Sequence, residues 1–357
     1  IIMGYRYIGS KVKVIDNVIG KISELCPSKG RVADLMSGTG VISTELRKRD
    51  YKVTANDLMT YSYHHSIVNL KFSSAPNFEK LIAFISDFHE VKPELSPYEN
   101  VINFLNNVKP KCGYFWNEFS CEGNPQNSER PRNYFSPENA RKLDGIREVI
   151  NNLSCDNILT DLERSLLLHD LIMAANDIAN IAGTYGHYMS RLNGRALTQL
   201  NLKCTDLLLK SDVENHIVMQ GYAEENASKI QCDLCYIDPP YMKRQYAANY
   251  HILETLARGD EPEAIGISGL RPWRDQYSNF CTKTKIRDSF KEIITNMGCN
   301  EFLISYSEDG LLTIEDFNKL LADFGDVKIE AFTHKRFRSN KSELQNELTE
   351  YLIHLHR

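Results

Sequence analysis

Short apolar runs alternate with stretches of helical periodicity along much of this chain. Apolar residues between positions 14 and 25 recur at the spacing of an amphipathic helix. Five short apolar runs predict buried strands, at 31–36, 52–57, 216–220, 233–237 and 301–307. A helix through Leu321 and two strands, at 327–332 and 351–356, are expected to close the chain. This alternation predicts an α/β fold, a doubly wound and mostly parallel sheet.

Residues 73–204 interrupt the alternation. This segment is rich in Asn, Pro, Ser and aromatic residues, and strong helical periodicity returns at 162–181. We therefore predict a discontinuous sheet domain, 1–72 with 205–357, and a mostly helical insertion, 73–204. The aromatic and basic residues of the insertion suit a nucleic-acid-binding face, but a plain helical subdomain with core aromatics has the same composition. The long loop at 261–285 is of a kind usually kept for function.

The composition is that of an ordinary globular protein, with 42% hydrophobic and 25% charged residues. The chain contains no apolar run of membrane-spanning length, and its first residues do not resemble a secretory signal, so a cytoplasmic protein is expected. Its nine cysteines lack the spacing of a disulfide framework. Cys232 and Cys235 form a CxxC pair, but their odd offset on a strand predicts opposite faces and no zinc site.

The net charge of −5 does not indicate a nucleic-acid-binding protein. Binding to DNA would require local basic surface instead. Basic residues gather at 191–203, 243–244, 271–287 and 335–338. Each of these clusters is also consistent with an ordinary solvated surface.

The strand at 233–237 is followed by Asp238, Pro239, Pro240 and Tyr241. Proline ends a strand, and in open α/β sheets ligands bind beyond the carboxyl ends of the strands. A carboxylate and a rigidly held carbonyl, on Asp238 and Pro239, can accept N–H bonds from an exocyclic amine and aim its lone pair at a methyl donor. Tyr241 would stack on a base turned out of a duplex. The alternative is a Pro-Pro turn after a core strand.

A glycine turn follows the strand at 31–36. Ser37, Gly38, Thr39 and Gly40 would let a cofactor approach the backbone closely, and Asp34 precedes them. The next strand ends in Asp57, where a carboxylate can hold two ribose hydroxyls. Together these features favour an adenosine-type ligand without a pyrophosphate. Alternatively, Asp57 only caps the next helix.

The ordered set of motifs resembles the Dam-like, alpha-group adenine-N6 DNA methyltransferases over nearly the whole chain. The resemblance rests on 6–11, on 34–40, on Asn56-Asp57 and on Asp238-Pro239-Pro240-Tyr241. It implies a Rossmann-like sheet that binds S-adenosylmethionine (AdoMet), with a target-recognition domain inserted between the glycine motif and the catalytic motif. It further implies methyl transfer to adenine N6 in a short duplex sequence by base flipping, in company with a restriction endonuclease, without metal or membrane.

The resemblance also assigns residues. The implied cofactor-binding set is Tyr7, Lys11, Asp34, Ser37, Gly38, Gly40, Asp57 and Asp238. Independently of the resemblance, the basic residues of the insertion and of the 261–285 loop supply the arginines expected to contact DNA, which are Arg130, Arg132, Arg191, Arg195, Arg271 and Arg274.

Two departures from the family pattern stand out. Met36 replaces the usual Phe, and Gln220-Gly221-Tyr222 lacks the acid that usually holds the cofactor's adenine amine. Cytosine N4 or an RNA base remains an alternative target for the same fold. A DNA-binding regulator on an inactive methyltransferase scaffold is the alternative of a different class.

Overall fold

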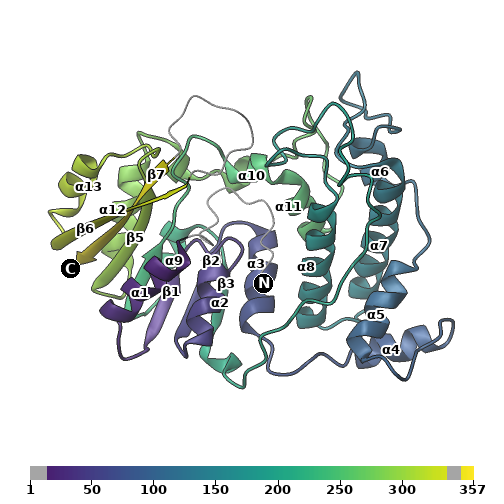
Figure 1. The fold of residues 1–357 in the computed structure, drawn as a ribbon, viewed down its shortest axis with the longest axis horizontal. Helices are drawn as coiled ribbons and strands as arrows, with labels where there is room; N and C mark the ends of the chain where they lie inside the picture. Colours follow the sequence, from purple (N-terminus) through teal and green to yellow (C-terminus); the bar gives the residue numbers. More distant parts are fainter. Residues whose placement is uncertain (1–13, 336–346) are drawn as a thin grey trace. The chain divides into compact units, whose positions relative to one another are not determined.

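The chain forms two compact units in a computed structural model that describes residues 14–335 and 347–357 (Figure 1). The helical unit comprises Lys71–Val213 and Ala247–Asp275. The sheet unit comprises Glu214–Tyr246, Gln276–Arg357 and the described residues up to Leu70. Because the chain leaves the sheet unit twice and returns, both units are discontinuous in sequence.

Seven strands build one sheet in the order β3-β2-β1-β4-β5-β7-β6. Their bounds are β1 Arg31–Asp34, β2 Lys52–Asp57, β3 Ile217–Gln220, β4 Leu234–Ile237, β5 Glu301–Ser307, β6 Asp326–Lys335 and β7 Glu347–His356. Strands β1 to β5 are parallel, and β7 runs antiparallel to both of its neighbours. The predicted mostly parallel α/β sheet is therefore confirmed. The strand order reverses between β1 and β4, which is where such sheets bind ligands.

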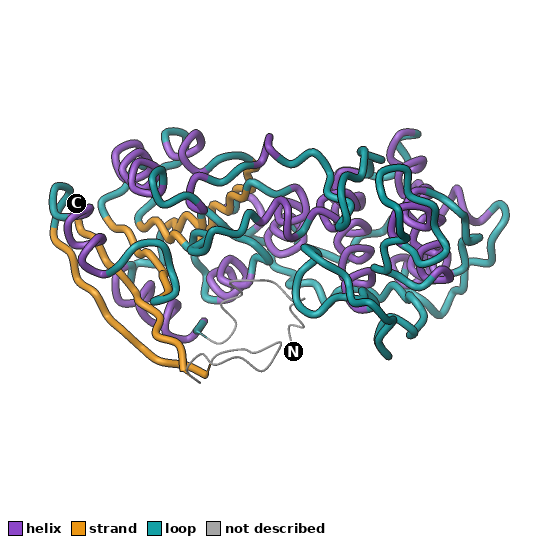
Figure 2. Tube along the Cα trace, turned by 90° about the horizontal axis from the view of Figure 1, so that it is seen from above, coloured by secondary structure: helices purple, strands orange, loops and turns teal. Residues whose placement is uncertain are grey.

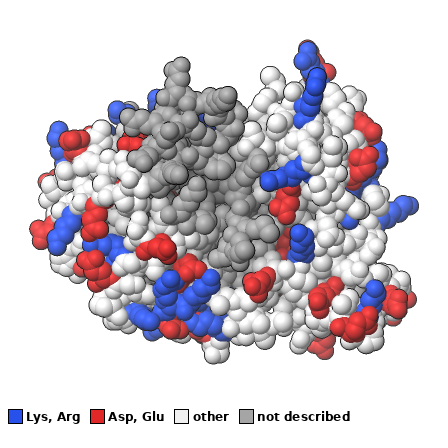
Figure 3. All heavy atoms as spheres, viewed as in Figure 1, with Lys and Arg blue, Asp and Glu red and all other residues white. Residues whose placement is uncertain are grey.

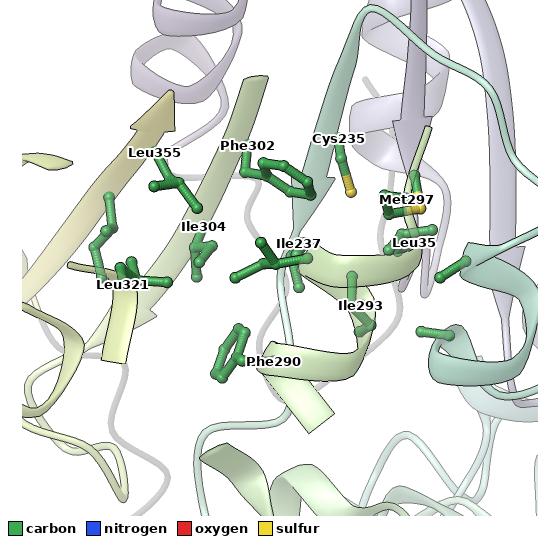
Figure 4. Packing of buried hydrophobic residues seen from close by; sticks show 14 of the residues in the cluster. Leu35, Cys235, Ile237, Phe290, Ile293, Met297, Phe302, Ile304, Leu321 and Leu355 are labelled. Carbon is green, nitrogen blue, oxygen red and sulfur yellow. The ribbon is translucent and has the colours of Figure 1, made fainter. Parts of the chain in front are cut away.

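Helices cover both faces of this sheet, so the central strands are apolar on both sides. The helices of this unit are α1 Ile15–Leu25, α2 Val41–Lys48, α3 Thr60–Leu70, α9 Ala223–Ala227, α12 Ile286–Asn296 and α13 Ile314–Leu321. In β4, Leu234 and Tyr236 belong to the core beneath α1 and α2, and Cys235 and Ile237 to the core beneath α9, α12 and α13. Figure 4 shows the second core, with Ile237 close to Ile304 and to Ile293 of α12. This alternation fixes which residues follow the strands at the ligand-binding edge.

The other unit is built from helices and loops (Figure 2). Its helices are α4 Glu79–Ser86, α5 Pro97–Asn106, α6 Tyr114–Phe119, α7 Pro137–Cys155, α8 Asp161–Asp177, α10 Tyr246–Asn249 and α11 His251–Arg258. Short 3₁₀ turns η1 Val213–Asn215, η2 Arg274–Gln276 and η3 Asn279–Cys281 complete the described secondary structure. Thr160 and Glu163 form a capping box that begins α8, which explains why the periodicity resumes there.

Two expectations from the sequence need correction or addition. Helix α12 was not predicted, and α3 entered only through the alternative that Asp57 caps the next helix. Cys232 and Cys235 do not face opposite sides: both belong to the core beneath α12, and both thiols interact with Cys299. The strand alternation does not apply to this pair because β4 begins only at Leu234. Among the described residues, no helix has the length and apolar character needed to cross a membrane.

Candidate active site

The turn after β1 lies at the point where the strand order reverses. Gly38 and Gly40 adopt left-handed backbone conformations, with φ values of 55° and 76°. The N–H of Gly40 donates to the carbonyl of Ser37 at 2.8 Å, which closes the turn before α2 begins. A side chain on Gly40 would also collide with Asn69, whose Nδ2 would lie 2.2 Å from the added Cβ. Glycine is therefore required here for backbone conformation and for packing against α3.

Asp57 ends β2 and connects it to this glycine turn. Its Oδ2 accepts a hydrogen bond from the N–H of Gly38 at 2.8 Å, and its Oδ1 accepts one from the N–H of Met59 at 2.9 Å. Asp57 as a whole is buried, with 7% of its surface exposed. Each carboxylate oxygen can accept more than one hydrogen bond. Asp57 can therefore brace the turn and still receive hydroxyl groups from a ligand.

Asp34 is a second carboxyl group in the same region, at the end of β1. Burial raises its pKa to about 7, the hydrogen bond from Ser43 acts in the opposite direction, and the charge of Asp57 raises it further. The Ser43 hydroxyl lies 2.7 Å from Oδ2 of Asp34. Asp34 is thus a buried acid that changes its protonation near neutral pH, held from the first turns of α2.

Asn56 and Asn226 form a pair that joins three strand ends, and this contact was not predicted from the sequence. Nδ2 of Asn56 donates to the carbonyls of Leu35 and Gly221, both at 3.1 Å. Nδ2 of Asn226, in α9, donates to Oδ1 of Asn56 at 2.8 Å. The only signal in the sequence was the position of Asn56 beside Asp57 at a strand end. This pair fixes the turn after β3 relative to β1 and β2.

Asp238, Pro239, Pro240 and Tyr241 continue directly from β4. Asp238 is half-buried and Pro239 is buried. The ring of Tyr241 packs edge-on against Tyr306 of β5, with centroids 6.2 Å apart. The carbonyl of Tyr241 accepts a hydrogen bond from the N–H of Leu311 at 3.0 Å. The aromatic end of the motif is therefore held by β5 and the loop that follows it.

The register of the sheet brings these groups to one edge. Asp34 pairs with Ala55 on one side and with Tyr236 on the other, so the glycine turn lies between the ends of β2 and β4. The N–H of Leu35 donates to the carbonyl of Tyr236 at 3.1 Å. The hydroxyl of Ser37 is buried and lies 3.0 Å from that of Ser66 in α3. Of the expected cofactor-binding set, Tyr7 and Lys11 lie outside the described residues.

The six arginines expected to contact DNA fall into two groups. Arg130, Arg191, Arg195 and Arg274 are exposed. Arg132 is completely buried, and its guanidinium forms an ion pair with Glu118 at 2.6 Å. Arg271 is 5% exposed and forms an ion pair with Asp260 at 2.7 Å, which it contacts through both terminal nitrogens. Arg132 and Arg271 therefore have structural roles in the helical unit, because their charged groups are occupied inside it.

Charge is mixed on the face of the molecule that Figure 3 shows. In Figure 3, basic and acidic side chains of the described residues are interspersed on the face shown, as the net charge of −5 would suggest. No group of three or more histidine, cysteine or acidic side chains in the described part of the chain is arranged to hold a metal ion.

Comparison with known proteins gives a consistent result. Residues 7–334 match the family described as D12 class N6 adenine-specific DNA methyltransferase. The chain is 34% identical to the type II methyltransferase M.FokI of Planomicrobium okeanokoites, over 98% of this chain and 52% of that protein. It is 32% identical to the modification methylase StsI of Streptococcus sanguinis, over 99% of this chain and 52% of that protein. It is 30% identical to M.CviAII of Paramecium bursaria Chlorella virus 1, over 97% of each chain. The chain thus spans about half the length of the first two relatives and nearly all of the third.

The buried acid predicts a pH dependence of stability. Burial raises the pKa of the native Asp34 carboxyl from its ordinary value of 3.8 to about 7, so the native state binds more protons than the unfolded state between these pH values. The stability from the protonated group is complete below about pH 4 and is lost as the pH rises through about 7. In the cofactor-free protein, Asp34→Asn should gain roughly 1–4 kcal/mol relative to wild type between about pH 4 and pH 8.

Urea denaturation across this pH range measures the effect. Asp233→Asn is a matched control, because Asp233 is exposed and lies before the opposite end of β4. If Asp34→Asn and wild type keep the same difference in unfolding free energy at every pH, Asp34 does not titrate as described.

Proposed function

Because this chain belongs to the D12 class of N6 adenine-specific DNA methyltransferases, we propose that it transfers a methyl group from AdoMet to adenine N6 in a short duplex DNA sequence. The observation that supports this proposal best is that three strand ends meet at one edge of the sheet. The glycine turn after β1 lies between Asp57 at the end of β2 and Asp238 after β4. A cofactor on the turn would thus lie between a ribose-binding acid and a group that serves the target amine.

We infer AdoMet as the cofactor because the residues present fit it. Gly38 and Gly40 leave backbone without side chains, and Asp57 offers carboxylate oxygens to the two ribose hydroxyls. When bound, AdoMet supplies a methyl group already activated by its sulfonium. Gln220 pairs in register with Asp57 at the end of β3, so the cofactor's adenine is expected beside it. The acid usual in the family is absent from 220–222. Because Nε2 of Gln220 donates to the Thr60 hydroxyl at 2.9 Å, its Oε1 would be the acceptor for the adenine amine.

Asp238, Pro239 and Tyr241 would receive the target base. The lone pair of adenine N6 is delocalised into the ring, so this amine is a weak nucleophile. The carboxylate of Asp238 and the carbonyl of Pro239 would accept its two N–H bonds and favour a tetrahedral nitrogen. The ring constraint of Pro239 and Pro240 sets the direction of that carbonyl before substrate binds. Tyr241 would stack on the flipped base, which requires it to leave the duplex.

We propose that sequence recognition resides in 73–204, with a contribution from 261–285. The catalytic part is proposed to comprise 1–72 and 205–357, apart from Ala247–Asp275, which belongs to the helical unit. Arg130, Arg191, Arg195 and Arg274 are the exposed arginines of these segments. Arginine reads guanine in the major groove or contacts phosphate, and an acidic protein needs such local groups to bind DNA. A restriction-modification context, with a companion endonuclease in a bacterial cytoplasm, is part of the same proposal.

The experiment that tests the function is methyl transfer to a library of randomised duplexes. Nucleoside analysis of the product distinguishes N6-methyladenine from N4-methylcytosine, and a parallel RNA library tests the remaining substrate class. Methylated adenine in one short sequence context is expected. A protein that binds DNA and AdoMet but modifies no base would be a regulator on an inactive scaffold.

Asp238→Ala should abolish methyl transfer, by about 10²-fold or more, because the carboxylate acts on the target amine. Affinity for AdoMet should stay within about tenfold of wild type. Single-turnover kinetics and calorimetry measure the two quantities. Asp233→Asn, at the opposite end of β4, is the matched control and should leave transfer intact. Turnover close to wild type in Asp238→Ala would show that the catalytic assignment is wrong.

Asp57→Ala should weaken AdoMet binding by roughly 1–3 kcal/mol, because two hydroxyl groups lose a charged acceptor. Isothermal titration calorimetry measures the affinity. Since Asp57 also accepts hydrogen bonds from Gly38 and Met59, urea denaturation of the same sample determines how much stability is lost. Unchanged affinity would leave Asp57 with a purely structural role.

Alanine substitutions of the six arginines should separate into two classes. Arg130, Arg191, Arg195 and Arg274 should change sequence preference or reduce the dependence of binding on salt, without loss of stability. The variants Arg132→Ala and Arg271→Ala should instead have a lower free energy of unfolding. For Arg132→Ala the loss should be roughly 3–5 kcal/mol, because a buried Glu118 would be left unpaired. The library assay and urea denaturation measure these effects. If no exposed arginine alters preference or salt dependence, recognition lies elsewhere.

A further inference from the structure

A tight turn in the helical unit presents an apolar tip to solvent. Ile265 and Leu270 pair antiparallel, with N–H to carbonyl distances of 2.9 and 2.8 Å in the two directions. Between them, Gly266 and Gly269 have φ values of 75° and 66°. Ile267, at the tip, is 70% exposed, and Ile265 is 50% exposed.

The buried side chain of Arg132 supports this turn through hydrogen bonds to its backbone. Its Nε and Nη2 donate to the carbonyl of Gly266 at 3.2 and 3.0 Å, and Nη2 also donates to the carbonyl of Ala264 at 3.1 Å. The fit is close, because a Cβ on Gly269 would lie 2.8 Å from Cδ of Arg132. A buried charge is costly unless its partners compensate for lost hydration. Here a fully buried guanidinium makes several of its hydrogen bonds to backbone carbonyls of one surface turn.

Further contacts fix the other side of the turn. The hydroxyl of Ser268 donates to the carbonyl of Gly186 at 2.7 Å, and the buried hydroxyl of Tyr134 lies 3.1 Å from the carbonyl of Ser268. The turn is thus held from two sides by groups that are distant in sequence. A tip held in this way loses little conformational freedom when it binds a partner.

The exposed apolar surface of Ile267 does not stabilise the folded state, since it stays in contact with water. We propose that Ile267 is a wedge that enters stacked base pairs of duplex DNA and favours the flipped-out state of the target adenine. This inference rests on the proposed function. Apolar side chains such as isoleucine can insert between base steps and unstack them, and an enzyme that modifies a base must open the duplex.

The loop that contains Asn127 and Arg130 favours duplex DNA as the partner of this turn. Nδ2 of Asn127 donates to Glu263, and Nη2 of Arg132 donates to the carbonyl of Asn127. The same loop carries exposed Arg130 two residues before Arg132. A cation suited to phosphate is therefore built on the same buried support as the apolar tip. Figure 1 shows the two loops at one end of the helical unit, beyond α6 and α11.

The test compares Ile267→Ala with wild type on two duplexes. One duplex carries the site found in the library with the target adenine paired, and the other has an abasic position opposite that adenine. On the paired duplex, kcat/KM should fall about tenfold or more, because opening the pair is no longer assisted. On the abasic duplex the variant should approach wild type, since the cost of opening is already small.

Fluorescence of 2-aminopurine at the target position provides a second readout. It should rise when wild type binds and rise much less with Ile267→Ala, while Ile267→Leu should behave as wild type. Phe88→Ala is the matched control, because Phe88 is 60% exposed in the same unit and packs with Phe84 and Phe104 instead of the turn. Equal melting temperatures exclude a loss of folding.

The outcomes separate the two hypotheses. If wild type methylates no duplex, the proposed function fails and the wedge fails with it. If wild type is active and Ile267→Ala is equally active on both duplexes, the wedge alone is overturned and the tip serves another partner. Equal loss on both duplexes also overturns it, because Ile267 would then contribute to binding and not to opening of the pair.

Discussion

The carboxylate of Asp57 is the interaction on which the candidate site depends. By accepting the N–H groups of Gly38 and Met59, it joins the end of β2 to the turn after β1 and orders backbone on both sides. Asn56, the preceding residue, extends the connection to Leu35 and Gly221. Three strand ends thus hold fixed positions before any ligand arrives. Preorganisation of this kind reduces the free-energy cost of binding a flexible cofactor.

The sequence predicted the elements whose pattern is local. The strand expected at 52–57 has the bounds found for β2, because its apolar residues lie between clear turn signals. Helix α3 has no readable helical period, because it is buried on most sides from Tyr61 to Leu70 and therefore has no polar face. The motifs at strand ends could be placed correctly at one edge, because parallel strands share their direction.

What the sequence could not reveal were contacts between distant segments. Residues 129–135 have the polar, basic composition of a surface loop, yet Arg132 is buried against Glu118 and the turn at Gly266. Glu118 is 14 positions away in the sequence, and the carbonyl of Gly266 is 134 positions away. The raised pKa of Asp34 has a similar origin, because it depends on burial between strands and on the nearness of Asp57. Charge type is visible in a sequence, whereas the surroundings of a charge are not.

The position of β7 has a consequence for synthesis on the ribosome. This strand follows β6 in the sequence and is the last of the described strands, yet it lies between β5 and β6, and its register extends along the whole length of both. While the chain emerges, β6 therefore has no partner in the sheet, and β5 has one unpaired edge. Exposed strand edges are sites of aggregation. The nascent protein thus has a vulnerable interval between translation of β6 and β7, in which a chaperone or rapid elongation would protect it.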